Sequence, residues 1–350
     1  MPQDHKRPAS PGRSSQVASD GTVETGNLRV PFSVFASNEA REAFTSALAP
    51  VPAESANDLS ALRAHYGAFN DRLRDRMLER FQVEIVETAI GGVPVHRVTP
   101  KSLRDDSGRV LLNLHGGAFM WGSGSGALVE AIPVAATSGL PVIAVDYRLA
   151  PEHKFPAASD DVQAVYEGLL GDTPAHAIGI YGCSAGAILT AQCMAQFLER
   201  SLPLPGGIAM ICGAGLLLWG DSAYTGNALS GERPDDEAPS AEAMIDVLQN
   251  YLGPTTPDDP RVTPGNNSQT IGRFPPSLLI TGSRDFAASS VATMHRRLVA
   301  QGVDAELFLF DGLWHAFHIF PDLPESTEVY RLLARFFNRT LTANKPRGTR

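Results

Sequence analysis

The sequence predicts an α/β fold built on a mostly parallel sheet of eight strands. Beyond about Val83, short apolar runs rich in β-branched residues alternate with amphipathic stretches of helical periodicity. Strands that alternate with helices form parallel sheets covered on both faces. The eight candidate strands are VEIVETAI, VPVHRVTP, VLLNLHG, PVIAVDY, IGIYG, GIAMICG, SLLITG and AELFLFDG.

Composition narrows the class of protein. Of the 350 residues, 43% are hydrophobic and 19% charged, which is a globular balance and excludes disorder throughout. The net charge of −9 argues against a basic face for nucleic acid. The longest apolar stretch, 207–220, is interrupted by glycines and is too short for a membrane-spanning helix.

The two ends of the chain are expected to be flexible. The leader, residues 1–26, is rich in Pro, Ser, Gly and charge and lacks the apolar core of a signal peptide. The tail, residues 343–350, is similarly polar. The three cysteines form no CxxC pair, which favours free thiols in a reducing cytoplasm. We therefore expect a cytoplasmic protein.

Two segments of the chain are expected to form a lid. The first, 27–81, contains amphipathic helical patterns at 38–49 and 58–81. The second, about 217–273, separates the sixth and seventh strands and is too long for a plain connection, with one helix expected near 240–252. Ligands bind at the carboxyl ends of parallel strands, where such an insertion emerges. The catalytic domain would then be 82–342.

A candidate nucleophile lies between the fifth strand and the next helix. The stretch 182–186, GCSAG, is a G-x-S-x-G motif in the required context of strand, turn and helix. A serine hydroxyl on such a strained turn can attack a carbonyl, and the glycines leave room for the crowded backbone. The alternative is a tight turn without chemistry. The surrounding strand and helix favour Ser184 as a nucleophile.

A glycine pair follows the third strand, in the stretch HGGAF at 115–119. Successive glycines let backbone N–H groups turn toward one point, which is how an oxyanion hole is built. An ordinary glycine turn is the alternative. Because the serine motif lies downstream in the expected order, the oxyanion hole is favoured.

Together these and three further motifs resemble the hormone-sensitive-lipase family of α/β-hydrolase esterases. The resemblance implies the α/β-hydrolase fold, a Ser-Asp-His triad and no cofactor. It also implies an oxyanion hole from the N–H groups of Gly116, Gly117 and Ala185. The motifs, in family order, are HGGAF (115–119), DYRLAPEHKFPAA (146–158), GCSAG (182–186), GSRD (282–285) and DGLWHAFH (311–318).

The resemblance assigns Ser184 as nucleophile, Asp285 as acid and His315 as base. Asp285 and His315 each follow a candidate strand, so both are expected on loops beside the serine. His315 would accept the serine proton and return it to the leaving alcohol, while Asp285 fixes the tautomer of the imidazole. Asp311 is a rival acid, but an Asp-Gly pair more often simply makes a turn.

Two residues depart from the family pattern. Cys183 stands where the family has Asp, and Ala187 where it has Gly. These changes put in doubt the hydrogen bonding beneath the serine and the room in the acyl pocket. They leave the triad itself intact.

The remaining histidines are expected to be structural. His115 would hold the oxyanion loop through a side-chain hydrogen bond. His318 either lines the acyl pocket or is buried with its hydrogen bonds satisfied, and the second interpretation is favoured. His65, His96 and His295 have no partners at metal-ligand spacing, so no metal is expected.

Apolar and charged residues around the motifs are expected to complete the site. Arg148, Glu152 and Asp160 are interpreted as one polar network that braces it. Large apolar side chains beside the oxyanion loop and the insertion are expected to bind substrate. These are Phe119, Met120, Trp121 and Trp219.

The sequence favours a serine hydrolase that cleaves carboxylic esters of short acyl chains or small aromatic acids through an acyl-enzyme intermediate. A lactonase with the same triad is the alternative, and the sequence does not separate the two. A non-catalytic receptor would lack a triad member, and an epoxide hydrolase or dehalogenase would carry a carboxylate in place of Ser184. The expected partner is a small ester or lactone, and the choice between monomer and homodimer stays open.

Overall fold

The computed structural model describes residues 16–17, 23–24, 30–47, 58–101, 108–217, 220–230 and 249–342. The chain divides into two units, Met1–Ser33 and Val34–Arg350. The smaller unit contains an antiparallel pair, β1 (Gln16–Val17) and β2 (Val23–Glu24). Trp219, the tail 343–350 and most of the leader 1–26 lie outside the described residues.

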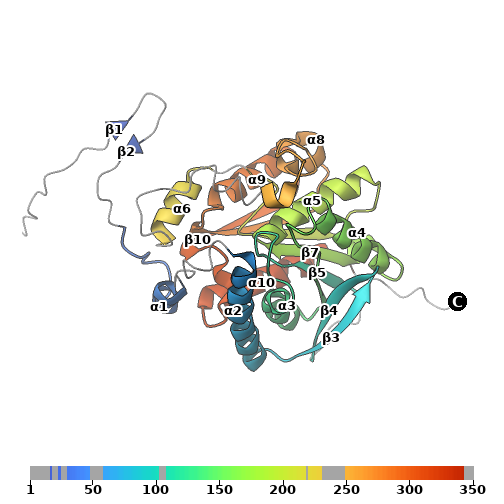
Figure 1. Ribbon diagram of the computed structural model, residues 1–350, viewed down its shortest axis with the longest axis horizontal. Coiled ribbons are helices and arrows are strands. Elements are labelled where there is room, and N and C mark those ends of the chain that lie inside the picture. The colour runs from blue at the N-terminus through green and yellow to red at the C-terminus, as the bar shows by residue number, and fades with distance from the viewer. Residues whose placement is uncertain are drawn as a thin grey trace, which may run out of the picture. The chain divides into compact units, whose positions relative to one another are not determined.

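An eight-stranded sheet forms the centre of the larger unit (Figure 1). The strand order is β10-β9-β8-β7-β5-β6-β4-β3. The pairs β3–β4 and β4–β6 are antiparallel, and every other pair is parallel. The prediction of eight strands in a mostly parallel sheet is confirmed. Their bounds are β3 (Val83–Ile90), β4 (Val93–Pro100), β5 (Val110–Leu114), β6 (Val142–Val145), β7 (Ile178–Cys183), β8 (Gly207–Ile211), β9 (Ser277–Arg284) and β10 (Ala305–Trp314).

Helices cover both faces of this sheet (Figure 1). On one face, α3 (Ser125–Ser138) packs against α10 (Pro324–Thr340). On the other lie α4 (Ala157–Leu170), α5 (Ala185–Glu199) and α9 (Ala288–Ala300). Every residue of β5, β6, β7 and β8 is buried, as expected of strands covered on two sides. These strands therefore form a rigid support for the loops that follow their carboxyl ends.

The two helices predicted before the first strand are α1 (Asn38–Ala47) and α2 (Leu59–Arg80). Helix α2 packs along α3 and buries Leu73 and Met77. Its Arg63 donates from Nε to the carbonyl oxygen of Met120 at 2.7 Å and from Nη2 to that of Ala150 at 3.0 Å, and it pairs with Glu152 at 2.7 Å. Arg63 thus ties α2 to the loop that follows β5.

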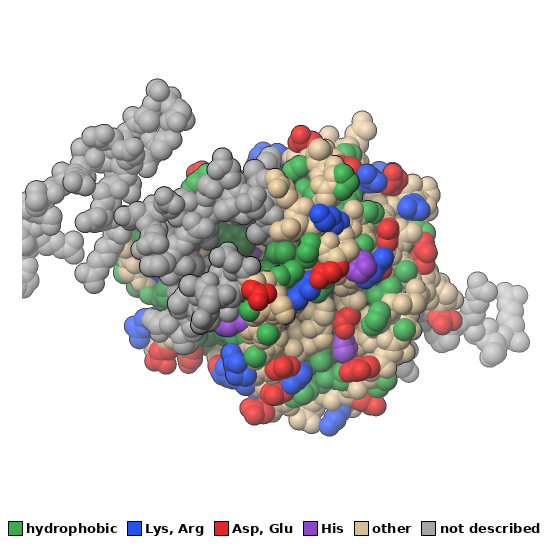
Figure 2. Space-filling model, in the orientation of Figure 1, with side chains coloured by type: hydrophobic (Ala, Val, Ile, Leu, Met, Phe, Trp, Pro, Cys, Tyr) green, Lys and Arg blue, Asp and Glu red, His purple; other side chains and the backbone are tan. Residues whose placement is uncertain are grey.

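The long segment between β8 and β9 contains α6 (Ser222–Ser230), the 3-10 turn η2 (Pro264–Asn266) and α8 (Ser268–Ile271). Residues 249–252, the described end of the helix expected near 240–252, are helical. Among the described residues, no helix combines the length and apolar character that crossing a membrane requires. On the face shown in Figure 2, acidic and basic side chains are interspersed.

We expect Arg63→Gln to lower the free energy of unfolding by about 1–2 kcal/mol, because it removes charge-assisted hydrogen bonds to two part-buried carbonyl groups. The matched control is Arg74→Gln on the same helix, since Arg74 pairs only with exposed Asp71 and Asp75. The control should change stability by less than about 0.5 kcal/mol. Urea unfolding measures both, and equal effects would contradict this role of Arg63.

A second prediction concerns His96, whose Nε2 lies 2.9 Å from Asp146 Oδ2. This hydrogen bond raises the pKa of His96. A histidine pKa raised by folding adds stability that is complete below about pH 6.5 and is lost as the pH rises through the raised value. His96→Gln should therefore destabilise the protein more at pH 6 than at pH 9. In an Asp146→Asn background, urea unfolding should show no such difference between the two pH values.

Candidate active site

Ser184 occupies a strained turn between β7 and α5. Its backbone has φ 55° and ψ −120°, a conformation that non-glycine residues adopt only where the surroundings impose it. A Cβ atom built on Gly182 or on Gly186 would overlap the carbonyl oxygen of Leu114 at the end of β5. Only glycine fits at both positions, so the turn can press against β5 and project the serine side chain outward.

The three residues assigned to the triad come together. His315 Nε2 lies 2.9 Å from Ser184 Oγ, and His315 Nδ1 lies 2.7 Å from Asp285 Oδ1. Asp285 is fully buried and also accepts hydrogen bonds from Thr281 Oγ1 and the Ala287 amide. Burial alone would raise the pKa of Asp285, but His315 and these hydrogen bonds hold it below its usual range. The geometry aligns His315 to take the Ser184 proton, while the buried carboxylate holds the imidazole in orientation.

Asp311, the rival acid, faces elsewhere. Its Oδ1 accepts a hydrogen bond from Ser283 Oγ at 2.9 Å, and Ser283 Oγ in turn accepts one from the Gly312 amide at 2.7 Å. Gly312 has φ 81°, which suits a turn after Asp. Asp311 therefore belongs to the turn within β10.

The glycine loop lies against the serine turn. A Cβ atom built on Gly116 would lie 3.4 Å from Ser184 Cβ. The amides of Gly116, Gly117 and Ala185 donate no hydrogen bond to another described residue. Ala185 is the first residue of α5, where helix N–H groups have no partner within the helix. Three backbone donors are thus available beside Ser184.

His115 holds this loop, as expected. Its Nδ1 donates to the Gly116 carbonyl oxygen at 2.7 Å, and its ring stacks on Tyr147 with centroids 4.2 Å apart. The Tyr147 hydroxyl donates to the His115 carbonyl oxygen at 2.7 Å. These contacts fix the direction in which the adjacent glycine amides point.

A cavity of about 310 Å³ opens onto Ser184 and His315. Tyr66 of α2 stacks on Trp121 with centroids 4.8 Å apart, and Phe286 stacks on His315. Helix α2 therefore forms one wall, although it lies more than a hundred residues before the serine in the sequence. The walls include Tyr66, Phe69, Asn70, Trp121, Val129, Glu130, Phe286 and Ile319.

The substrate-binding prediction needs a correction for two residues. Trp121 lines the cavity, but Phe119 and Met120 do not. Both are buried in the core, where Phe119 stacks on Tyr251 with centroids 3.7 Å apart. The positive φ values of Ala118 and Phe119 turn the chain so that these side chains face the core. The prediction for Trp219 falls outside the described residues.

The expected single polar network is wrong as well. Arg148 pairs with Asp161, Glu152 pairs with Arg63 of α2, and the Asp160 side chain accepts a hydrogen bond from Gln196. Neighbouring positions on α4 point in different directions, so adjacent carboxylates take different partners.

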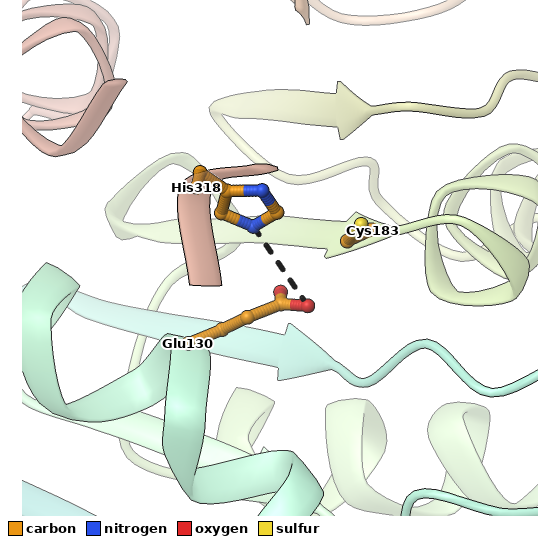
Figure 3. A group of neighbouring side chains, drawn as sticks. All are labelled: Glu130, Cys183 and His318. Atoms are coloured by element: carbon orange, nitrogen blue, oxygen red, sulfur yellow. Dashed lines mark ion pairs between the residues drawn. The ribbon is translucent and has the colours of Figure 1, made fainter. Parts of the chain in front are cut away.

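A buried polar group beneath the serine turn was not predicted from the sequence (Figure 3). Glu130 lines the cavity, and its Oε2 accepts a hydrogen bond from Asn113 Nδ2 at 3.0 Å. Burial raises the pKa of Glu130 to about 8 and lowers that of His318 to about 3. His318 is buried, as expected, but neither ring nitrogen has a hydrogen-bond partner among the described residues. The one sequence signal was a lone Glu in the apolar stretch ALVEAIPVAA.

Comparisons with known proteins identify the fold as that of an α/β hydrolase. A family model described as α/β hydrolase fold matches residues 111–319. An esterase of Acinetobacter venetianus is 28% identical over 232 residues, which are 65% of this chain and 74% of that protein. The crystal structure of esterase E25 has a TM-score of 0.79 at 28% identity and covers 91% of this chain and 99% of its own.

A crystal structure of a hormone-sensitive lipase from a metagenome library has a TM-score of 0.70 at 26% identity, with 86% of this chain and 99% of that chain covered. The resemblance seen in the motifs is confirmed. The chain belongs to the hormone-sensitive-lipase family of α/β hydrolases and is a carboxylesterase-type hydrolase.

Proposed function

We propose that this protein hydrolyses carboxylic esters of short acyl chains or small aromatic acids through an acyl-enzyme intermediate. The continuous chain from Ser184 Oγ through His315 to Asp285, at 2.9 and 2.7 Å, carries the proposal. Similarity to proteins named esterases supports open-chain esters over the lactone alternative. The cytoplasmic location stays a prediction, and so does a homodimer as the alternative to a monomer.

In the first half of the reaction, Ser184 Oγ attacks the ester carbonyl carbon while His315 Nε2 takes the serine proton. The carbonyl oxygen becomes an oxyanion, which the amides of Gly116, Gly117 and Ala185 would bind. When the C–O bond to the alcohol breaks, His315 passes its proton to the leaving oxygen. The acyl group then remains on Ser184.

In the second half, water replaces the alcohol. His315 Nε2 accepts a proton from the water while the water oxygen attacks the acyl carbon. It then passes this proton to Ser184 Oγ as the bond between Ser184 and the carboxylic acid product breaks. The imidazolium formed in both halves is stabilised by Asp285, whose buried carboxylate is held ionised. Each well-placed oxyanion donor contributes about 2.7–4 kcal/mol to lowering the barrier.

The cavity supports a small acyl group. Its volume of about 310 Å³ is at the lower end of the range for ligand pockets, roughly 300–1,000 Å³. Aromatic rings from Tyr66, Phe69, Trp121 and Phe286 surround it. Such rigid walls leave little room for a long chain.

Ser184→Ala should fold normally but lose turnover by a factor on the order of 10⁶, since the triad acts as a unit. His315→Ala should lose a similar factor. Thermal melting of each variant controls for folding, and p-nitrophenyl butyrate hydrolysis measures the loss. Retention of more than a few per cent of activity by folded Ser184→Ala would overturn the mechanism.

Asp285→Asn should reduce turnover by roughly 10⁴, because the amide no longer fixes the productive tautomer of His315. Asp311→Asn is the matched control and should change turnover little, since Asp311 bonds to Ser283. Steady-state kinetics on the same ester compares the two. The opposite order would move the acid to Asp311.

Across p-nitrophenyl esters of increasing length, kcat/KM should peak between about two and eight acyl carbons, the range implied by the family, and lactones should be poorer substrates. Phe69→Ala removes one wall of the cavity and should move the optimum to longer chains, because the ring fills space that additional methylene groups would need. Efficient hydrolysis of long-chain triglyceride by the unaltered protein, with little activity on butyrate esters, would contradict this interpretation of the cavity.

A further inference from the structure

Three potential metal ligands converge at the floor of the cavity, behind Ser184. Glu130 comes from α3, Cys183 is the last residue of β7, and His318 belongs to the 3-10 turn η3 (Phe317–Ile319). One oxygen, the sulfur and one nitrogen all lie within 4.8 Å of one another, and all three residues are buried. Figure 3 shows the Glu130 and His318 side chains pointing toward one another, with Cys183 beside them.

The polar atoms of this cluster are incompletely satisfied. His318 Nε2 lies 3.9 Å from Glu130 Oε1, which is too long for a hydrogen bond. Both ring nitrogens of His318 and the Oδ1 of Asn113 are buried without a partner among the described residues. Leaving such atoms unpaired is energetically unfavourable. The arrangement therefore has the character of a site built around an additional atom.

We propose that Glu130, Cys183 and His318 form a binding site for Zn²⁺, and that its occupation inhibits ester hydrolysis. Thiolate, imidazole and carboxylate are the three ligand types of protein zinc sites. With Zn–S near 2.3 Å and Zn–N or Zn–O near 2.1 Å, two ligands of one ion lie at most about 4.4 Å apart. The separation of 3.9 Å between Glu130 and His318 is within that limit. The Cys183 sulfur, which lies within 4.8 Å of both, would have to move by at most about 0.4 Å to meet it.

Charge balance supports a dication. On binding, the Cys183 thiol and the Glu130 carboxyl group each release one proton to solvent, so two negative ligands neutralise Zn²⁺ and the neutral imidazole adds no charge. A buried site with no net charge avoids the cost of an uncompensated ion.

The residues around this cluster provide a hydrogen bond to one of its ligands and a route by which the ion can enter. Asn113 Nδ2 donates to Glu130 Oε2 at 3.0 Å, which leaves Oε1 directed at His318. Hydrogen bonds of this kind commonly orient the ligands of a metal ion. Glu130 and Cys183 both line the cavity. Zinc can therefore enter from the cavity, and cavity water can take the fourth position.

Inhibition follows from the position of the ion. Cys183 and Ser184 both line the cavity, so zinc bound to the Cys183 sulfur would occupy space near the nucleophile. A positive charge there also opposes formation of the His315 imidazolium, since His318 is already close enough to His315 for their charges to interact. Both effects would raise the barrier for attack.

A second group, Cys212, Asp285 and His315, also has its donor atoms within 4.8 Å. There the donors are already engaged: His315 Nδ1 with Asp285 Oδ1, and Cys212 Sγ as acceptor of the Ala316 amide at 3.3 Å. The group around Glu130, where both His318 nitrogens lack a partner among the described residues, is therefore the better site. The Cys212 side chain interacts with that of Cys183, so Cys193 provides the matched control.

The test is equilibrium dialysis of the full chain, without an affinity tag, against micromolar Zn²⁺, with bound metal counted by atomic absorption. We expect one zinc ion per chain, in Ser184→Ala as well as in the unaltered protein, so binding is measured independently of turnover. Cys183→Ser and Glu130→Gln should weaken binding on the order of 100-fold or more, by loss of a ligand. Cys193→Ala should bind zinc as the unaltered protein does.

Hydrolysis of p-nitrophenyl butyrate should fall in parallel with zinc occupancy, and Cys183→Ser should need correspondingly more zinc. Absence of stoichiometric binding, or binding that persists in Cys183→Ser, would overturn the site. If the ligand variants do not fold, Co²⁺ added to the unaltered protein gives the answer. A thiolate-to-cobalt absorption band would support the site, and its absence would overturn it.

Discussion

The close contact between the serine turn and the end of β5 is the constraint on which the site depends. Gly182 and Leu114 are register partners in adjacent parallel strands, and Gly186 brings the first turn of α5 onto the same carbonyl group. Without side chains at these glycines, the turn can hold Ser184 at a positive φ. The same contact sets Gly116 beside the serine, so nucleophile and oxyanion loop are positioned by one packing arrangement.

The other residues of the proposed triad reach this point because the sheet is parallel. The loops after β7, β9 and β10 emerge at the same edge, and they carry Ser184, Asp285 and His315 respectively. A hydrogen bond at 2.7 Å then aligns the imidazole with a buried carboxylate. The sheet supplies rigidity, so Ser184 and His315 are aligned for proton transfer without reorganisation at the moment of reaction.

Helix α2 forms one wall of the cavity beside Ser184. It packs on α3 through Leu73 and Met77, and Arg63 links it to the loop that follows the oxyanion glycines. Tyr66 then stacks on Trp121 above the serine. Substrate selection and the stability of this helix are thus linked physically, because the residues that anchor α2 also place a wall of the pocket.

The sequence by itself determined the α/β fold, the eight strands and the two early helices, because the alternation of strands and helices is a local property of the chain. Motif spacing, also local, led to the proposed triad of Ser184, Asp285 and His315. The sequence did not determine which side chains face the cavity. Phe119 and Met120 are adjacent to Trp121 but turn into the core through positive φ values, which no periodicity reveals. Nor could it place Glu130, Cys183 and His318 together, since these residues lie on three elements separated in sequence. Only tertiary packing decides such contacts, because they depend on how helices and loops cross the sheet rather than on the residues next to them in the chain.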